Sequence, residues 1–278
     1  MTANSKNRKR LDLETVRRFQ RRLLKWYAKN GRHDFIWRKH PTPYRVLVAE
    51  VMLQQTQVSR VEPKYREFLE RYPTWRALAR ARTPELLKLW SGLGYNRRAL
   101  LLRACAQQVV EQHGGRLPSD AARLRALPGI GPYTAAAVNV FARNRDEVCI
   151  DTNVRRVLIH ELGLSHSIGR DQLHAVARQM LPPGQSRAWH GALMDYGRMV
   201  ATSRNTGVRP LSGSAAPFVG STRYYRGRLL KALLGGWLTW AKLAVALGLP
   251  TMKVKKIAAG LARDRLVEVR GQRLRLPR

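Results

Sequence analysis

Apolar residues along the first two thirds of the chain recur at the spacing of amphipathic helices. A first helix with one apolar face is predicted around residues 16–27, and Gly31 ends it. Pro43 suits the first turn of a second helix, because proline has a helical φ and the first turn needs no amide donor. No convincing strand pattern occurs up to about residue 203, so this region is predicted to be all-α. The apolar face of the first helix comprises Val16, Phe19, Leu23, Leu24 and Tyr27, and further helices are predicted from residues 83–94, 97–115, 119–129, 132–144, 153–163, 170–181 and 186–201.

The pattern changes after residue 201. Residues 202–222 are rich in Gly, Ser, Pro and Thr, which is typical of a linker or long loop. Three short helical patterns follow, at residues 226–234, 239–248 and 251–266. Residues 267–278 alternate like a hairpin that turns at Gly271 and Gln272. The chain is therefore predicted to have a helical core at residues 1–203, a linker at 204–220 and a small winged-helix-like α+β domain at 221–278.

The charge balance points to a polyanionic partner. The chain has 52 Lys and Arg but only 18 Asp and Glu, a formal net charge of +34. Such an excess favours nucleic acid over an anionic membrane or an acidic protein. Residues 221–278 alone contain 14 basic and 2 acidic residues. DNA contact is favoured for this segment, and a helical cap with a solvated basic face is the alternative.

Cysteine content and hydropathy indicate a cytoplasmic protein, associated with the nucleoid if the source is bacterial. The two cysteines, Cys105 and Cys149, cannot build a disulfide framework, which fits a reducing compartment. The basic N-terminus leads into no apolar segment, as a signal peptide would. Lys231 and Lys242 interrupt the most apolar stretch of the chain, so no membrane partner is expected.

The stretch "LPGIGPYTAAAV", residues 127–138, combines a tight turn with a helix of small side chains. Gly129 and Gly131 leave the backbone accessible, and Pro132 starts a helix whose first amides lack partners. Those amides and the helix dipole can bind one phosphate. A purely structural hinge explains the same pattern equally well.

Four motifs together narrow the interpretation. "LPGIGPYTA", followed about twenty residues later by "IDTNVRRVL", resembles the helix-hairpin-helix DNA glycosylase superfamily. "PYRVLVAEVMLQQTQV" and "GLGYNRRALLL" are similar to motifs of the MutY-type adenine DNA glycosylases. The resemblance extends from Trp37 to Ala201, with the motifs in the family's order and spacing. It implies two helical subdomains, residues 38–149 and residues 1–37 with 150–203, that bind duplex DNA between them as a monomer.

The resemblance also implies a catalytic group of Glu50, Asp151, Tyr133 and Asn153. Members of this family flip a nucleotide out of the duplex and hydrolyse its N-glycosidic bond. Glu50 matches the general acid that protonates the departing purine, and its apolar neighbours are expected to raise its pKa. Asp151 matches the carboxylate that stabilises the cationic sugar, although it could simply cap the following helix. Asn153 is expected to position Asp151 or a water, or to serve as a cap.

Tyr133 occupies the position where strand-cutting relatives carry a lysine. A phenol cannot form a Schiff base, so a monofunctional glycosylase with weak or no lyase activity is predicted. The alternative is a tyrosine that only packs in the hinge.

The remaining matches concern the substrate. Gln55 and Tyr95 match residues that enter the duplex and fill the gap, although an exposed helical Gln and a half-buried loop Tyr are the structural alternatives. Trp37 and Leu53 could equally be core residues. The predicted DNA contacts are Gln55, Tyr95, Leu127, Gly129, Gly131 and Thr134, and the predicted base-pocket residues are Trp37, Arg38, Leu53 and Asp195.

The chain departs from the family pattern in two respects. Most relatives bind a [4Fe-4S] cluster through cysteines spaced C-x6-C-x2-C-x5-C, a spacing that falls here on Ala201, Val208, Leu211 and Pro217. None of these can ligate iron, so no metal or other cofactor is expected. Typical MutY enzymes also carry a Nudix-like domain that reads 8-oxoguanine, and the roughly 60 residues after the linker are too few for it.

The predicted function is monofunctional removal of adenine from a mispair with 8-oxoguanine or guanine. The substrate is accordingly double-stranded DNA with a mispaired or damaged base. Two alternatives remain. One is a mismatch glycosylase that removes thymine or uracil opposite guanine, and the other is a non-catalytic DNA-binding regulatory protein.

Overall fold

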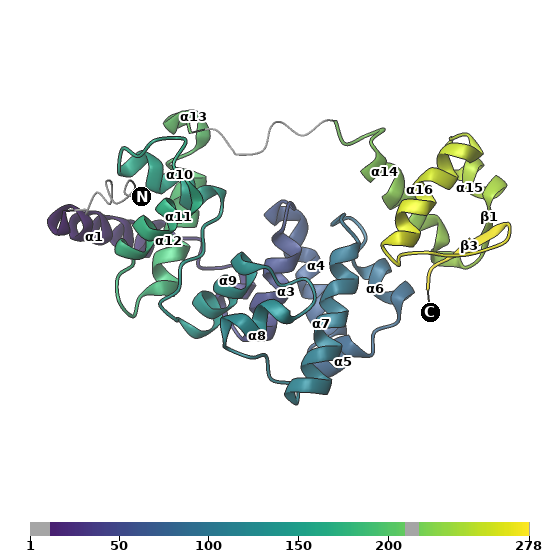
Figure 1. The fold of residues 1–278 in the computed structure, drawn as a ribbon, viewed down its shortest axis with the longest axis horizontal. Coiled ribbons are helices and arrows are strands. Elements are labelled where there is room, and N and C mark those ends of the chain that lie inside the picture. Colours follow the sequence, from purple (N-terminus) through teal and green to yellow (C-terminus); the bar gives the residue numbers. More distant parts are fainter. Residues whose placement is uncertain (1–11, 209–216, 278) are drawn as a thin grey trace, which may run out of the picture. The chain divides into compact units, whose positions relative to one another are not determined.

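The computed structural model describes residues 12–208 and 217–277, which form two compact units. Unit 1 comprises Met1–Pro43 and Pro132–Gly213, and unit 2 comprises Tyr44–Gly131 and Ser214–Arg278 (Figure 1). The sequence predicts that the chain passes from one subdomain to the other at residues 37/38 and 149/150. These passages lie at 43/44 and 131/132 in the structure, because α9 (Pro132–Arg143) packs against α12 (Ser186–Met199) of unit 1.

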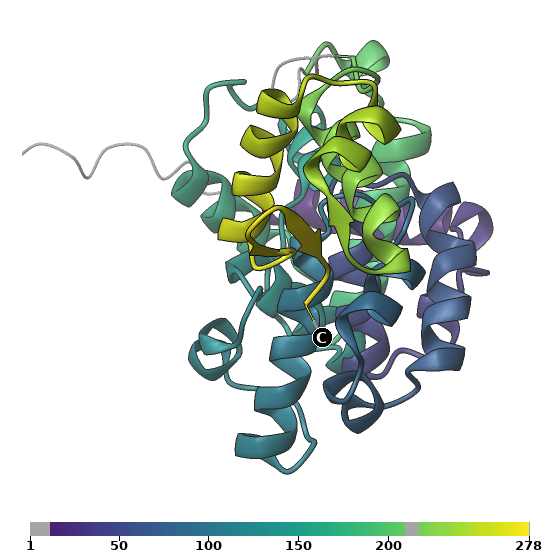
Figure 2. The same ribbon diagram turned by 90° about the vertical axis from the view of Figure 1, so that its right-hand side faces the viewer.

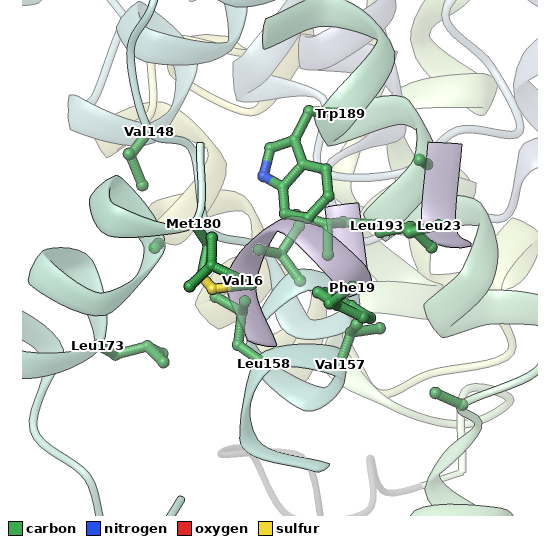
Figure 3. Close-up of a cluster of buried hydrophobic side chains, with 14 residues drawn as sticks. Val16, Phe19, Leu23, Val148, Val157, Leu158, Leu173, Met180, Trp189 and Leu193 are labelled. Carbon is green, nitrogen blue, oxygen red and sulfur yellow. The ribbon is translucent and has the colours of Figure 1, made fainter. Parts of the chain in front are cut away.

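The described residues of unit 1 form helices and connecting loops, with no strand. Its centre is a contact between α1 and α12, in which Phe19 meets Trp189 edge-on with the ring centres 5.7 Å apart. Val157 and Leu158 contribute to the same cluster from α10 (Figure 3). The helices of unit 1 are α1 (Leu13–Asn30), α2 (Ile36–Lys39), α9, α10 (Thr152–Glu161), α11 (Arg170–Gln179), α12 and α13 (Ser203–Thr206).

The first part of unit 2 is also helical. Helix α7 packs against α5, and Trp90, which follows α6, is completely buried against Phe68 of α4. The helices of this part are α3 (Pro43–Leu53), α4 (Val58–Arg71), α5 (Trp75–Ala79), α6 (Thr83–Leu89), α7 (Arg97–His113) and α8 (Ala121–Ala126).

The second part of unit 2 combines three helices with a small antiparallel sheet. The hairpin pairs Arg270 with Arg273, so its two-residue turn is Gly271 and Gln272, as the sequence predicted. A third strand pairs with β3, in the order β1-β3-β2. Figure 2 shows this sheet beside the three helices. The elements are α14 (Thr222–Ala232), the 3-10 helix η1 (Leu233–Gly235), β1 (Leu238–Thr239), α15 (Trp240–Leu247), α16 (Thr251–Arg263), β2 (Glu268–Arg270) and β3 (Arg273–Arg275).

The structure confirms the predicted fold class, a helical core followed by a small α+β segment. The sequence analysis did not predict α2, α4, α5, α13 or β1. The signal for α4 was present, because Val61, Tyr65 and Phe68 follow one another at helical spacing and are all buried. Helix α13 corrects the expectation of a continuous loop after residue 201, and residues 209–216 of that loop lie outside the described part of the chain. None of the described helices is long and apolar enough to cross a membrane.

Two glycines, Gly129 and Gly131, lie in the turn before α9, and the structure requires only one of them. Gly129 has φ +77°, and a Cβ at this position would lie 3.0 Å from the Cβ of Leu101 in α7. Gly131 has no such φ, and a Cβ there would meet no atom within 4 Å. The folded protein therefore explains the glycine at 129 but not the glycine at 131.

We predict that Gly129→Ala lowers the stability of the chain by about 1 kcal/mol or more, because alanine is strained at this φ and crowds Leu101. Gly131→Ala is the matched control and should change stability by less than about 0.5 kcal/mol. Urea unfolding of the two variants and the parent measures both effects. Equal midpoints for the two variants would contradict this account of the turn.

Candidate active site

The predicted catalytic residues belong to both units. Asp151, Asn153 and Tyr133 lie in unit 1, whereas Glu50 lies in unit 2. Asp151 is the N-cap of α10, and its Oδ1 accepts a hydrogen bond of 2.7 Å from the amide of Val154. The Asn153 Nδ2 donates to the other carboxylate oxygen at 2.8 Å. Asp151 thus caps the helix, and Asn153 holds its second oxygen. Neither contact excludes a catalytic role for the carboxylate.

Ionisation of the Asp151 carboxyl group is opposed by its burial. Burial raises its pKa above the ordinary value, and hydrogen bonds from Val154 and Asn153 and the charge of Arg156 only partly offset burial. A carboxylate in this state gains stability when a positive charge develops beside it. This is the electrostatic property that stabilisation of a cationic sugar requires.

A buried arginine that the sequence analysis missed holds Asn153 in place. Arg156 is 8% exposed, and its Nη2 donates to the Asn153 Oδ1 at 2.8 Å. Its Nε donates at 2.6 Å to the carbonyl of Ala201, just after α12. At Gly197 of α12, a Cβ would lie 2.9 Å from both the Cβ and the backbone oxygen of Asn153. Helix α12 therefore packs directly against Asn153, and only glycine permits this approach.

A second residue of α12 fixes the segment before Asp151. The amide of Cys149 donates to His190 Nε2 at 3.2 Å, and Nδ1 of the same ring lies 2.8 Å from the carbonyl of Ser186. Because Nε2 accepts, Nδ1 carries the proton and the ring is neutral. Burial lowers the pKa of His190 further from its ordinary value. The chain on both sides of Asp151 is thus attached to α12.

Asp195, a predicted base-pocket residue, lies at the centre of a buried ion pair. It is completely buried, and its Oδ2 accepts from Arg38 Nη1 at 2.6 Å. The Arg32 Nε donates to Oδ1 at 2.8 Å. Burial opposes ionisation, but the two guanidinium groups outweigh it and hold the pKa of Asp195 below its ordinary value. Trp37 is 9% exposed and stacks on Phe35, with ring centres 4.8 Å apart. A role of these residues in base recognition stays a prediction.

Residues in and next to the turn before α9 differ in solvent accessibility. Tyr133 is half-buried and packs on a cluster around Ala137 and Cys149. Leu127 and Thr134 are each 3% exposed, so their side chains face the protein interior. Contact of these two residues with DNA stays a prediction and would have to use the backbone.

In unit 2, Glu50 is the single acidic residue of α3, a helix whose other residues are mostly apolar. Glu50 itself is half-buried, between Ala49 and Val51, which are 2% and 6% exposed. Leu53, the last residue of the helix, is also half-buried. The expected rise in the pKa of Glu50 stays a prediction.

Gln55 and Tyr95, which are predicted to enter the duplex, lie on two loops that both contact Arg98. Gln55 and Tyr95 are exposed and have left-handed φ angles, +52° and +46°. Arg98 of α7 donates to the carbonyl of Gln54 at 2.6 Å, and to that of Gly94 at 3.0 Å. Its guanidinium also lies 5.5 Å from the centre of the Tyr95 ring. Burial lowers the pKa of Arg98 to about 10, so it remains charged at neutral pH. Sequence reasoning did not identify Arg98, since an arginine at a helix start usually faces solvent.

Comparisons with known proteins show which family the chain belongs to. A sequence profile described as "HhH-GPD superfamily base excision DNA repair protein" matches residues 48–183, which include Glu50 and Asp151. An adenine DNA glycosylase of Mycolicibacterium smegmatis is 39% identical over 76% of this chain and 78% of its own length. The chain belongs to the HhH-GPD superfamily of base excision DNA repair proteins. It is a MutY-like DNA N-glycosylase, as the sequence predicted, and its substrate is DNA.

Two further relatives of the glycosylase act on pyrimidines according to their names. A thymine/uracil-DNA glycosylase of Pyrobaculum aerophilum is 32% identical over 72% of this chain and 91% of its own length. The solved structure of a thermostable thymine-DNA glycosylase superposes with a TM-score of 0.64 at 27% identity. It covers 69% of this chain and 90% of its own. The same fold therefore occurs in glycosylases named for different bases.

We predict that His190 makes the glycosylase less stable as the pH falls below about 6.5. Its pKa in the folded protein lies below that of the unfolded chain, so the unfolded chain binds the proton first. Protonation also breaks the hydrogen bond from Cys149. The loss should reach up to about 1.4 kcal/mol per pH unit. Thermal midpoints at pH 7.5 and 5.5 measure it.

His190→Gln should show a smaller midpoint difference between these two pH values than the parent. His174→Gln, at an exposed position of α11, is the matched control and should behave like the parent. An unchanged pH dependence in His190→Gln would show that another group is responsible.

Proposed function

We propose that this glycosylase removes adenine that is mispaired with guanine or 8-oxoguanine, by hydrolysis and without cutting the strand. The observation that carries the proposal is the 39% identity to a relative named adenine DNA glycosylase, over 78% of that relative's length. Relatives of the same name from other organisms extend this similarity, one of them with 35% identity over 88% of both chains.

In the proposed reaction, Glu50 donates a proton to a ring nitrogen of the flipped adenine. Protonation converts the base into a neutral leaving group, and the glycosidic bond breaks with its electron pair moving to the base. Asp151 stabilises the positive charge that remains on the sugar, and its incompletely compensated carboxylate suits this role. Water then adds to C1′ and loses a proton to the Glu50 carboxylate, which restores the enzyme and leaves an abasic site.

Tyr133 supports the monofunctional part of the proposal. Strand cleavage through a Schiff base needs an amine, and a phenol cannot supply one. Tyr133 is half-buried near the start of α9, a position that also suits contact with a substrate.

The turn before α9, which contains Gly131, and the loops that contain Gln55 and Tyr95 are proposed to bind the DNA. The open space in front of Gly131 suits the approach of a phosphate to the backbone amides. Gln55 and Tyr95 are exposed, and Arg98 holds the loops that carry them. Side chains that enter a duplex need both properties, exposure and a fixed position. In this proposal Asp195 contributes to the base pocket through Arg38, which it orients.

A second candidate is removal of thymine or uracil opposite guanine. The similarity to the thymine/uracil-DNA glycosylase of Pyrobaculum aerophilum, over 91% of that relative, favours it.

We further propose that the glycosylase works without an iron–sulfur cluster, as a monomer in the cytoplasm. Ala201 and Val208, at two of the four positions expected for ligands, are 3% and 2% exposed and have no ligand atom. Pro217 offers none either, and Leu211 lies outside the described residues. A hydrogen bond of 2.8 Å from Asn205 Nδ2 of α13 to the carbonyl of Val200, the C-cap of α12, holds this segment. Cys105 and Cys149 are buried thiols, which suits a reducing compartment.

We predict that the parent releases adenine from A·G or A·8-oxoguanine duplexes in single turnover, in the presence of a metal chelator. Glu50→Gln should lower the rate constant by about 10²–10⁴, the usual contribution of a general acid, while duplex binding persists. The duplex panel also contains T·G and U·G, and alkali reveals the abasic product.

Glu111→Gln, an exposed position on α7, is the matched control and should cleave like the parent. Loss of thymine or uracil without loss of adenine would replace the proposal by the second candidate. Strand cleavage without alkali would contradict the role given to Tyr133.

A further inference from the structure

Residues 240–263 form a helix-turn-helix within the second part of unit 2. Helix α15 ends at Leu247, and α16 begins at Thr251 after a turn in which Gly248 has φ +65°. Val254, Ile257 and Leu261 of α16 are buried against the neighbouring helices. The opposite side of α16 is thus free to face a partner, as the second helix of this motif does when it binds DNA.

The acidic residues of this segment are already neutralised. Asp264 pairs with Arg226 at 2.5 Å, and Glu268 pairs with Arg275 at 2.7 Å. The other described basic residues therefore form a surface of one sign, which attracts a polyanion. They are all exposed and comprise Arg223, Arg228, Lys231, Lys242, Lys253, Lys255, Lys256, Arg263, Arg265, Arg270 and Arg273.

The exposed side of α16 combines charge with an apolar side chain. Met252, Lys256 and Arg263 fall on one face at helical spacing, and Met252 is 76% exposed. Arg270 and Arg273 flank the hairpin turn and are exposed as well. Cations suit phosphates, and a flexible apolar side chain suits the edge of a base in the major groove.

This segment is attached to a loop that we propose enters the duplex. Arg223 of α14 donates to the Tyr95 hydroxyl at 2.5 Å, and its guanidinium lies 5.6 Å from the centre of that ring. Arg97, the first residue of α7, lies 3.8 Å from Asp264. Contacts of Tyr95 with DNA and of α16 with DNA would therefore occur on one duplex.

We propose that α16 and the β2–β3 hairpin form a second duplex-binding surface, which contacts DNA beside the damaged base and adds affinity independent of the mispair. The inference rests on one part of the proposed function, namely that the loop containing Tyr95 binds DNA.

The test is a charge-removal variant of the full chain, Lys256→Gln/Arg263→Gln/Arg273→Gln. Its affinity for a fully paired duplex should fall at least tenfold at about 0.1 M salt. The slope of log K against log[salt] should become less steep by about 0.9 for each phosphate that the variant no longer neutralises. Fluorescence anisotropy measures both. Arg17→Gln/Arg21→Gln/Lys25→Gln, three exposed positions on α1, is the matched control with the same change in net charge.

The inference is supported if only the first variant shows weaker binding and a shallower slope. It is overturned if the first variant binds like the parent, or if both variants bind more weakly to the same extent, since a solvated basic surface would produce either result. The single-turnover rate constant of the α1 control variant should equal that of the parent. Absence of adenine release in the parent would refute the proposed function and leave the binding result intact, so the two failures are distinguishable.

Discussion

The buried guanidinium of Arg156 connects the start of α10 to the end of α12 by hydrogen bonds. The position of Asp151 depends on this connection. Arg156 holds Asn153, and Asn153 holds the second oxygen of the carboxylate. Each contact uses a polar group that would be costly to bury without its partner. The proposed chemistry needs a carboxylate that is fixed in one place yet not fully compensated. These contacts fix the carboxylate, and burial leaves its charge incompletely compensated.

The same helix, α12, accounts for several apparently separate features of unit 1. Its His190 holds the segment before Asp151, and its Asp195 binds Arg32 and Arg38. Its Gly197 permits the close approach to Asn153. Packing of Trp189 against Phe19 of α1 places this helix in a buried hydrophobic cluster of the unit. The hydrophobic core therefore serves the site directly, by fixing the helix from which the site is held.

Much of this architecture was predictable from the sequence, because its signals are local. Helical spacing around Phe19 and the hairpin turn at Gly271 each specify their element without reference to the rest of the chain. Asp151 and Asn153 could be predicted to lie together for the same reason, because they belong to one short motif. The contacts of Arg156, Arg98 and His190 could not, because their partners lie up to 47 residues away and only the folded chain brings them together. Helix α4, although periodic, was missed outright.

Helix α12 positions Asp151 through Asn153. The most direct measurement is single-turnover base release by Gly197→Ala, in which one methyl group displaces Asn153. Gly227→Ala, in a helix with open space in front of the glycine, is the matched control. We expect at least a tenfold lower rate constant in Gly197→Ala only, with the duplex Kd within twofold of the parent and far-UV circular dichroism preserved. An unchanged rate constant in the folded Gly197→Ala protein would show that the function of Asp151 does not depend on this contact.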